Sequence, residues 1–152
     1  MNIFILHTNP KICAQYHCDK HVVKMIVESA QMLSNCHPDG TNGIYKHTHI
    51  NHPCSKWVRE SAENYKWLCE LGVNLCIEYT HRYGKIHKTE KLLIWLSNNI
   101  PANLERIGLT KFALAMPEIY KKNDSVISYQ KYYIAEKSKI LNYTNTEKPY
   151  FL

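Results

Sequence analysis

Apolar residues recur every three to four positions along most of the chain, and this spacing predicts a largely helical protein. The first predicted helix begins at the Asn-Pro pair of residues 9–10, an N-cap followed by a first-turn proline, and continues to about Asn35. The second begins at Pro53 and ends before Gly84, because glycine commonly follows the last helical turn. Gly72 is expected to mark a kink inside this second helix.

Two connecting segments lie beside these long helices. Residues 36–52 are rich in Gly, Asn, His and Thr and predict a loop, whose length suggests a functional role. Residues 2–6, "NIFIL", form a short apolar run that is either a strand or an extended arm.

The second half of the chain predicts shorter elements. Residues 88–99 form a short helix, and residues 124–143 form a last helix capped by its first Asp or Ser. Residues 100–123 contain two prolines and a glycine and should be mostly turns, with a short helix around 111–116. We therefore expect one helical domain over residues 1–152, all-α or mainly α. It would be a compact single-layered bundle of about four unequal helices with a short N-terminal extended segment.

The composition predicts a cytoplasmic protein that does not contact a membrane. No run approaches the 18 or so apolar residues of a membrane span, and residues 1–10 lack the basic start and apolar length of a signal peptide. The six cysteines form no CxxC pair, so reduced thiols are expected rather than a disulfide framework.

The net charge of +6 is concentrated in the second half of the chain. Residues 1–80 carry 7 Lys and Arg against 7 Asp and Glu, whereas residues 81–152 carry 12 against 6. A basic half with many tyrosines suits a face that binds nucleic acid, where cations meet phosphates and rings stack on bases. A solvated lysine-rich surface would have the same composition.

A polar strip runs along the first predicted helix. At about 100° per residue, six polar residues fall within a band roughly 80° wide: His17, His21, Lys24, Glu28, Gln31 and Asn35. Imidazoles titrate near neutral pH and serve as acids, bases and ligands, so we predict that the strip is the wall of a cleft. The alternatives are a surface ion pair between Lys24 and Glu28, and histidines that are buried and hydrogen-bonded.

The same histidines raise the question of a metal. His17 and His21 lie one turn apart, and a third ligand would come from His47, His49, His52 or Cys54. The spacing lacks the glutamate of the metalloprotease motif, so neither a metal nor any other cofactor is expected. No phosphate-binding glycine loop and no Gly-x-Ser-x-Gly motif is present.

The last predicted helix carries aromatic and cationic residues at three- and four-residue spacing. These are Tyr129, Tyr132, Tyr133 and Lys137, with Lys131 beside them. Such a strip would stack on a nucleobase and hold its phosphate. The other interpretation is that the tyrosines belong to the core with their hydroxyls at its rim.

Two segments, "QYHCDKHVVKMIVESAQML" and "NHPCSKWVRESAENY", resemble a group of uncharacterised small phage proteins. More remotely, the order of elements resembles the pyrimidine-dimer DNA glycosylase family (endonuclease V type) of phages and bacteria. The similar positions are Lys24, Glu28 and Gln31 in the first helix, Asn51, His52, Pro53 and Trp57 at the second, Glu78, Arg82 and Gly84 at its end, and Tyr129, Lys131, Tyr132 and Tyr133 in the last.

The resemblance implies a helical DNA glycosylase and AP lyase that binds duplex DNA and removes a damaged or modified base. In that family the N-terminal amine attacks the sugar C1′, a first-helix glutamate assists, and basic groups hold phosphates. Here Asn2 is not a small residue, so Met1 is expected to be retained. The nucleophile is then the Met1 amine, a desolvated Lys24, or a water activated by Glu28 or Asp19.

Site residues follow from the strip and the resemblance together. The expected catalytic residues are Met1, His17, His21, Lys24 and Glu28. The expected substrate-binding residues are His52, Arg59, Arg82, Tyr129, Lys131, Tyr132, Tyr133 and Lys137. Arg59 would otherwise pair with Glu63. The competing functions are a non-catalytic phage module that captures a nucleotide or host factor, and a metal-dependent hydrolase. If the chain is phage-encoded, its compartment is the host cytoplasm.

Overall fold

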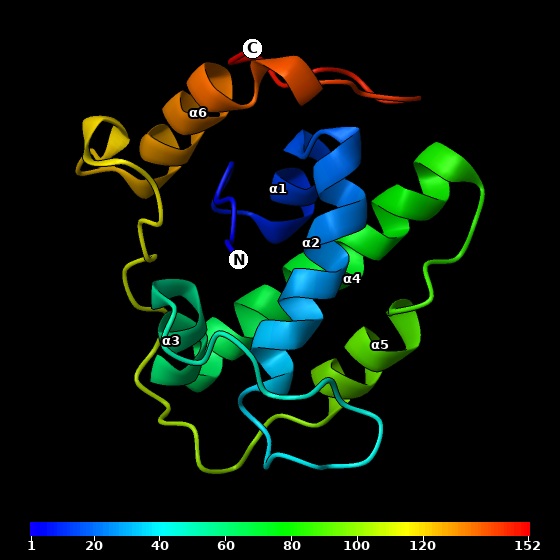
Figure 1. The fold of residues 1–152 in the computed structure, drawn as a ribbon, viewed down its shortest axis with the longest axis vertical. Coiled ribbons are helices and arrows are strands. Elements are labelled where there is room, and N and C mark those ends of the chain that lie inside the picture. The colour runs from blue at the N-terminus through cyan, green and yellow to red at the C-terminus, as the bar shows by residue number, and fades with distance from the viewer.

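The computed structural model describes residues 1–152 as an all-helical protein without strands (Figure 1). The α-helices are α1 (Pro10–Tyr16), α2 (Asp19–Ser34), α3 (Pro53–Glu60), α4 (Ala62–Tyr83), α5 (Glu90–Asn98) and α6 (Ser125–Glu136). Two short 3-10 helices, η1 (Glu118–Tyr120) and η2 (Ser138–Ile140), flank α6. The all-α prediction is confirmed, but the expected number of about four helices was wrong. None of the helices combines the length and the apolar character that crossing a membrane requires.

Helix α4 forms the centre of the fold and packs against α1, α2, α3 and α5. It runs unbroken through Gly72, where a Cβ atom would lie 2.9 Å from Leu93 Cδ2. Gly72 therefore permits the close approach of α5. The helix ends at Gly84, which adopts the left-handed conformation with φ 66° as the sequence predicted.

The first predicted helix is divided at His17 and Cys18, which have extended backbones. The Arg82 side chain donates to the carbonyl oxygens of Gln15 and His17 at 3.1 and 2.8 Å. The Tyr133 hydroxyl accepts from the Cys18 N–H at 3.0 Å. Residues distant in sequence thus satisfy backbone groups that a continuous helix would pair internally.

The second predicted helix is divided at Ser61, whose φ of −154° and ψ of 156° are those of extended chain. The Ser61 hydroxyl accepts from the Asn64 N–H at 3.0 Å and caps α4. The Ala62 N–H donates to the carbonyl of Glu105 at 2.8 Å. Ser61 therefore serves as the N-cap of a new helix, although the pattern of apolar residues continues across it.

The C-terminal half differs more from prediction. Residues 111–116 are not helical, and their apolar side chains pack half-buried against the core. Asp124 caps α6 as expected, its carboxylate accepting from the Ile127 N–H at 3.0 Å. However, α6 ends at Glu136 rather than Tyr143, because the chain then turns and the Tyr143 hydroxyl donates to the carbonyl of Tyr16.

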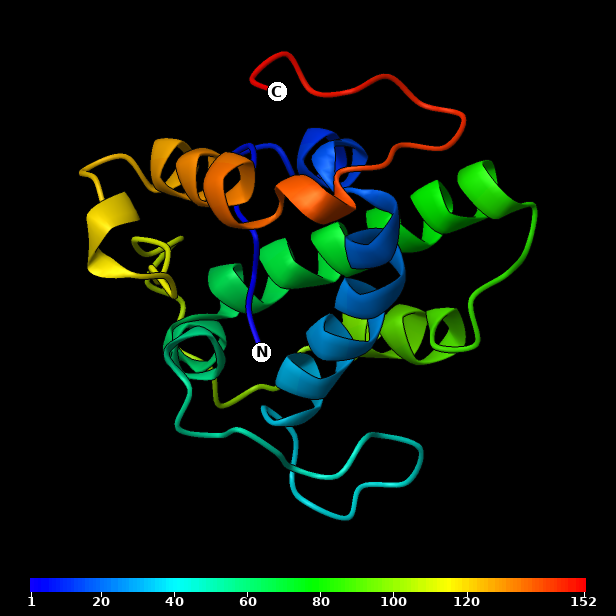
Figure 2. The same ribbon diagram turned by 45° about the horizontal axis from the view of Figure 1, so that its top comes forward.

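Residues 3–6 form an extended arm rather than a strand, and all four side chains are buried. Side chains replace the missing strand partner: the Gln130 amide donates to the Leu6 carbonyl at 3.1 Å, and the Cys13 thiol donates to the Phe4 carbonyl. In both ribbon views the arm runs beside α2 and ends near α3 (Figures 1 and 2). Burial of the arm fixes the position of the N-terminus.

Candidate functional site

The N-terminal amine lies against the carboxylate of Glu28 on α2. The Met1 nitrogen is 3.2 Å from Glu28 Oε1, and the Asn2 N–H donates to the same oxygen at 3.1 Å. The Met1 side chain is only 2% exposed although the residue as a whole is half-buried. The exposed part of Met1 is therefore its main chain, which carries the amine.

Asn2 holds the end of the arm in place through three elements. Its Nδ2 donates to the carbonyl of Ala115 at 2.9 Å, and its Oδ1 accepts from the Tyr129 hydroxyl of α6 at 3.2 Å. The Cys54 thiol on α3 is 3.7 Å from the same oxygen. These contacts orient the main chain that carries the amine, a role of Asn2 that no sequence pattern indicated.

Lys24 completes the charge arrangement around Glu28. Its Nζ is 3.7 Å from Glu28 Oε2, so the ion pair one turn along the helix is present. The Lys24 side chain is 68% exposed, whereas that of Glu28 is 11% exposed. Lys24 is therefore solvated, and the desolvation that would make its amine a nucleophile is absent.

His52 lies beside the amine at the start of α3. Its Nδ1 accepts from the Cys54 N–H at 3.1 Å and caps the helix. Burial lowers the pKa of His52, and the positive charges of the N-terminal amine and His49 lower it further, while Glu28 opposes them. His49 has a positive φ of 50°, an uncommon conformation for a residue with a side chain.

His21 is buried in an aromatic stack between α2 and α6. Its ring stacks on Phe4 at 4.4 Å, and its Nδ1 is 2.7 Å from the Tyr133 hydroxyl. Burial lowers the pKa of His21 to about 3, with added repulsion from His17, Lys137 and Lys24. His21 is thus neutral at pH 7 and orients neighbouring groups rather than carrying a charge.

His17, which the sequence suggested as a catalytic residue, does not lie in the helix that carries His21, Lys24 and Glu28. It falls in the break between α1 and α2 and is fully buried. Its Nδ1 is 2.7 Å from the carbonyl of Cys13, which fixes the neutral tautomer with the proton on Nδ1. Burial lowers its pKa to about 4.

Arg82, which the sequence suggested as a substrate-binding residue, forms its contacts inside the protein. Its side chain is fully buried, with ion pairs at 3.0 Å to both Asp19 and Glu78. Asp19 also accepts from the Thr144 hydroxyl at 2.7 Å. The Arg82 guanidinium thus joins α1, α2 and α4.

Arg59 does not form the expected pair with Glu63. Its guanidinium donates to the carbonyl of Ile50 at 2.6 Å, and Nη1 is buried. Glu63, the expected partner, instead accepts from the Gly108 N–H at 2.7 Å. Arg59 thus fixes the end of the loop that carries His49 and His52.

The predicted aromatic strip on α6 contains both buried residues and residues that reach the surface. Tyr129 and Tyr133 are fully buried, as the core interpretation expected, and their hydroxyls bond to protein groups. Lys131 is exposed and Tyr132 half-buried. Lys137 Nζ lies over the Tyr132 ring at 5.0 Å.

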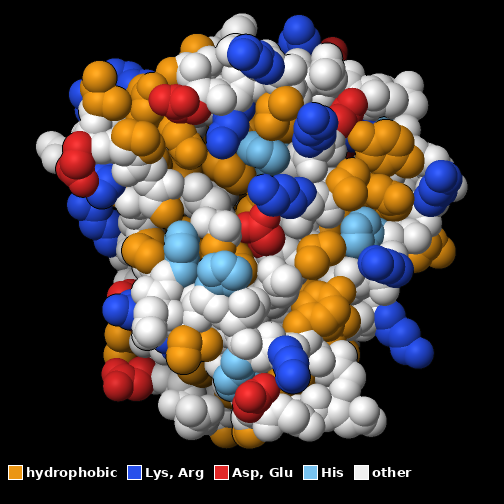
Figure 3. All heavy atoms as spheres, in the orientation of Figure 1, with side chains coloured by type: hydrophobic (Ala, Val, Ile, Leu, Met, Phe, Trp, Pro, Cys, Tyr) orange, Lys and Arg blue, Asp and Glu red, His pale blue; other side chains and the backbone are white.

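The face that carries the N-terminus presents a mixed chemistry. In the orientation of Figure 1, pale-blue histidine side chains surround a single acidic group near the centre, with Lys and Arg side chains around them (Figure 3). Five cavities of the protein are lined by residues other than Met1, Lys24, Glu28 and His52. No three His, Cys, Asp or Glu side chains converge as metal ligands.

The six cysteines are all free thiols, and five of them are buried. Burial raises the pKa of Cys54, whose thiol lies 3.7 Å from Asn2 Oδ1, to about 11. Cys54 is therefore protonated at neutral pH.

The family comparison matches the N-terminal part of the chain. Residues 1–91 match a family model described as pyrimidine dimer DNA glycosylase. The match includes the amine, Glu28 and the helices α1 to α4, and it ends inside α5. No curated protein and no solved structure matches the chain.

Proposed function

Because the chain belongs to the pyrimidine dimer DNA glycosylase family, we propose that it removes a damaged base from duplex DNA with the Met1 amine as nucleophile. The first substrate class to test is a pyrimidine dimer, which the family description names. The same amine would also react with an abasic site, which already presents a sugar without a base. Membership of this family supports a DNA glycosylase-like function, and the use of the Met1 amine as nucleophile is our proposal.

The observation that carries this proposal is the separation of 3.2 Å between the Met1 nitrogen and Glu28 Oε1. The amine is held at the surface by the buried arm and by the contacts of Asn2. A fixed and accessible amine beside a carboxylate is the arrangement that nucleophilic catalysis by an amine requires.

In the proposed reaction, the uncharged amine attacks C1′ of the damaged nucleotide. The bond between C1′ and the base nitrogen breaks, its electron pair goes to the base, and the base takes up one proton from solvent. The nitrogen attached to C1′ then loses a proton to Glu28. The sugar ring opens, its C1′–O4′ electron pair goes to O4′, and Glu28 returns the proton to that oxygen. The product is an iminium ion between the protein and the sugar.

Glu28 is suited to this proton transfer because it has two polar neighbours of different accessibility. Oε1 faces the main-chain nitrogens of residues 1 and 2, and Oε2 faces the exposed Lys24. Lys24 is thereby free to contact a phosphate while its charge keeps the carboxylate oriented. Exposed Lys131 and half-buried Lys137 extend the positive charge onto α6.

Retention of Met1 is a separate part of the proposal. Asn2 is a large residue for removal of the initiator methionine, and the Met1 side chain packs against the core. If Met1 were removed, the nitrogen of Asn2 would become the amine, and it already lies 3.1 Å from Glu28 Oε1. With or without Met1, the N-terminal amine would therefore lie beside the Glu28 carboxylate.

Borohydride trapping tests the proposal, because borohydride reduces an iminium ion to a stable secondary amine. Protein incubated with duplex DNA carrying a pyrimidine dimer or an abasic site should give a covalent adduct. Glu28→Gln should reduce the rate of trapping by about 100-fold or more. The control Glu70→Gln, on the exposed side of α4, should react like the unchanged protein.

The outcomes separate the competing functions. Lys24→Ala should retain trapping, because its solvated side chain is not the nucleophile in this account. DNA binding without any adduct on either substrate would contradict the amine mechanism and favour a non-catalytic binding module.

A further inference from the structure

His52 presents an imidazole N–H group that the amine reaction leaves without a role. Its Nδ1 accepts from the Cys54 N–H at 3.1 Å. Because this bond occupies the lone pair of Nδ1, the neutral ring carries its proton on Nε2. Nε2 donates to no group of the protein, and unlike Nε2 of His17 it is not enclosed in the interior. The N–H group of His52 is therefore available to a bound substrate.

Cys54 connects the His52 ring to the end of the N-terminal arm. The Cys54 thiol lies 3.7 Å from Asn2 Oδ1. The Asn2 N–H in turn donates to Glu28 Oε1 at 3.1 Å, and the Met1 nitrogen is 3.2 Å from the same oxygen. The imidazole is close enough to the amine and to the carboxylate for both charges to shift its pKa. The three groups therefore face the same substrate.

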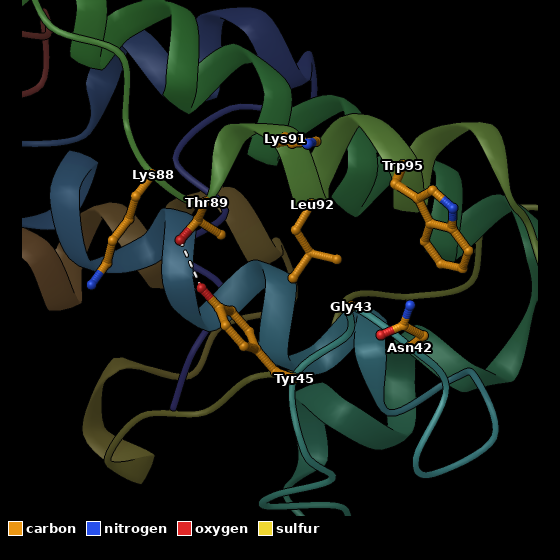
Figure 4. Close-up of a pocket in the computed structure, with 8 residues that line it drawn as sticks. All are labelled: Asn42, Gly43, Tyr45, Lys88, Thr89, Lys91, Leu92 and Trp95. Carbon is orange, nitrogen blue, oxygen red and sulfur yellow. Dashed lines mark hydrogen bonds between the residues drawn. The ribbon is translucent and has the colours of Figure 1, made fainter.

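The loop that ends at His52 is anchored to two helices. The Tyr45 hydroxyl is 2.8 Å from Thr89 Oγ1 at the start of α5 (Figure 4). The Thr48 N–H donates to Asn35 Oδ1 at 3.1 Å, and the Thr48 carbonyl accepts from Asn35 Nδ2 at 2.7 Å. These contacts and the bond to Cys54 fix the ring before substrate arrives. A donor held in this way needs no reorganisation during the reaction.

His52 is suited to donate as a neutral ring. Burial lowers its pKa, and the charges of the N-terminal amine and His49 lower it further against the opposing effect of Glu28. A second proton would occupy Nδ1 and break the bond from the Cys54 N–H. A neutral imidazole held at the first turn of a helix can polarise a substrate oxygen through its remaining N–H.

We propose that His52 is a further catalytic residue for base removal, and that its Nε2–H donates to the carbonyl oxygen O2 of the departing pyrimidine. This inference rests on the amine reaction proposed above. When the bond between C1′ and the base nitrogen N1 breaks, the electron pair left on N1 spreads onto O2. The hydrogen bond stabilises that charge, the imidazole keeps its proton, and the base takes up its proton from solvent.

An abasic site provides the test, because its base has already left. Borohydride trapping is followed in a single turnover on duplex DNA with a pyrimidine dimer and on abasic duplex DNA. His52→Asn should slow trapping on the dimer by about 100-fold and leave trapping on the abasic site unchanged. Asparagine is a favourable N-cap residue, so its side chain can still accept from the Cys54 N–H. Circular dichroism checks the fold.

His49→Asn is the matched control. His49 belongs to the same loop but is exposed, and asparagine tolerates its positive φ of 50°. This variant should trap both substrates at the rates of the unchanged protein.

The results distinguish this role from the amine reaction. Rapid trapping of the dimer by His52→Asn would overturn the role of His52 alone. An equal loss on both substrates would also overturn it, because His52 would then only hold the N-terminus in place. Unchanged protein that traps abasic DNA but not the dimer removes no base, which would contradict the role of His52 and retain the amine. Unchanged protein that traps neither substrate would overturn the amine reaction itself.

Discussion

Acid should destabilise this protein through its buried histidines, of which His17 is the most deeply buried, and the size of the effect follows from this burial. The folded-state pKa of His17 is about 4 against 6.5 for an unperturbed histidine. Because the folded pKa is the lower one, the unfolded chain takes up a proton first as the pH falls. The stability contributed by neutral His17 is therefore fully present above pH 6.5 and is lost progressively between pH 6.5 and 4.

The loss of folding stability in acid can be calculated for His17 alone. At pH 5 the unfolded His17 is almost fully protonated and the folded one is about nine-tenths neutral, so linkage gives a loss of about 2 kcal/mol relative to neutral pH. His21, with a folded pKa of about 3, adds a similar loss. Such losses are a large part of the stability of a typical domain.

The assay is urea unfolding followed by circular dichroism between pH 7.5 and 4.5. His17→Asn retains a donor near the Cys13 carbonyl but has no group that titrates. The variant should be less stable at neutral pH, and its stability should fall less steeply, by about 1.4 kcal/mol per pH unit near pH 5. Parallel curves for the two proteins would refute the assignment of a neutral, buried His17.

Three further predictions concern packing and buried polar groups. Tyr133→Phe removes the hydroxyl that His21 contacts and should destabilise the protein by about 1–3 kcal/mol, whereas an unchanged urea midpoint would contradict this. Gly72→Ala places a methyl group against buried Leu93 and should lower the thermal midpoint despite the higher helix propensity of alanine; a higher midpoint would show that the helices are not so close. Arg82→Ala leaves the buried carboxylate of Glu78 and the half-buried carboxylate of Asp19 without their partner and should destabilise by about 3–5 kcal/mol, to be measured by calorimetry against the unchanged protein; a loss under 1 kcal/mol would argue against the buried network.

Local sequence signals predicted the helix ends that depend on local chemistry. Asp124 caps α6, Gly84 terminates α4, and Pro53 begins α3 in agreement with their positions in the sequence. The break at His17 was not predictable in this way, because Arg82 binds the carbonyls there from 65 residues along the chain. A helix-compatible sequence was divided by a tertiary contact.

The sequence predicted that Met1 and Glu28 belong to the candidate site, but it did not predict the residues that position them. Met1 and Glu28 were expected from the resemblance, and they lie together. His17 was assigned to the same face only because a continuous helix was assumed. Asn2, which orients the amine, gave no sequence signal, because its partners come from α3, α6 and the segment before η1.

The most direct test of the central claim is to locate the attachment point of trapped DNA. The borohydride adduct is digested with nuclease and protease, and the modified peptide is identified by mass spectrometry. We expect the reduced sugar to be attached to the N-terminal nitrogen, and we expect no adduct after selective acetylation of that nitrogen. A sugar on Lys24 or another lysine, or undiminished trapping after acetylation, would contradict it.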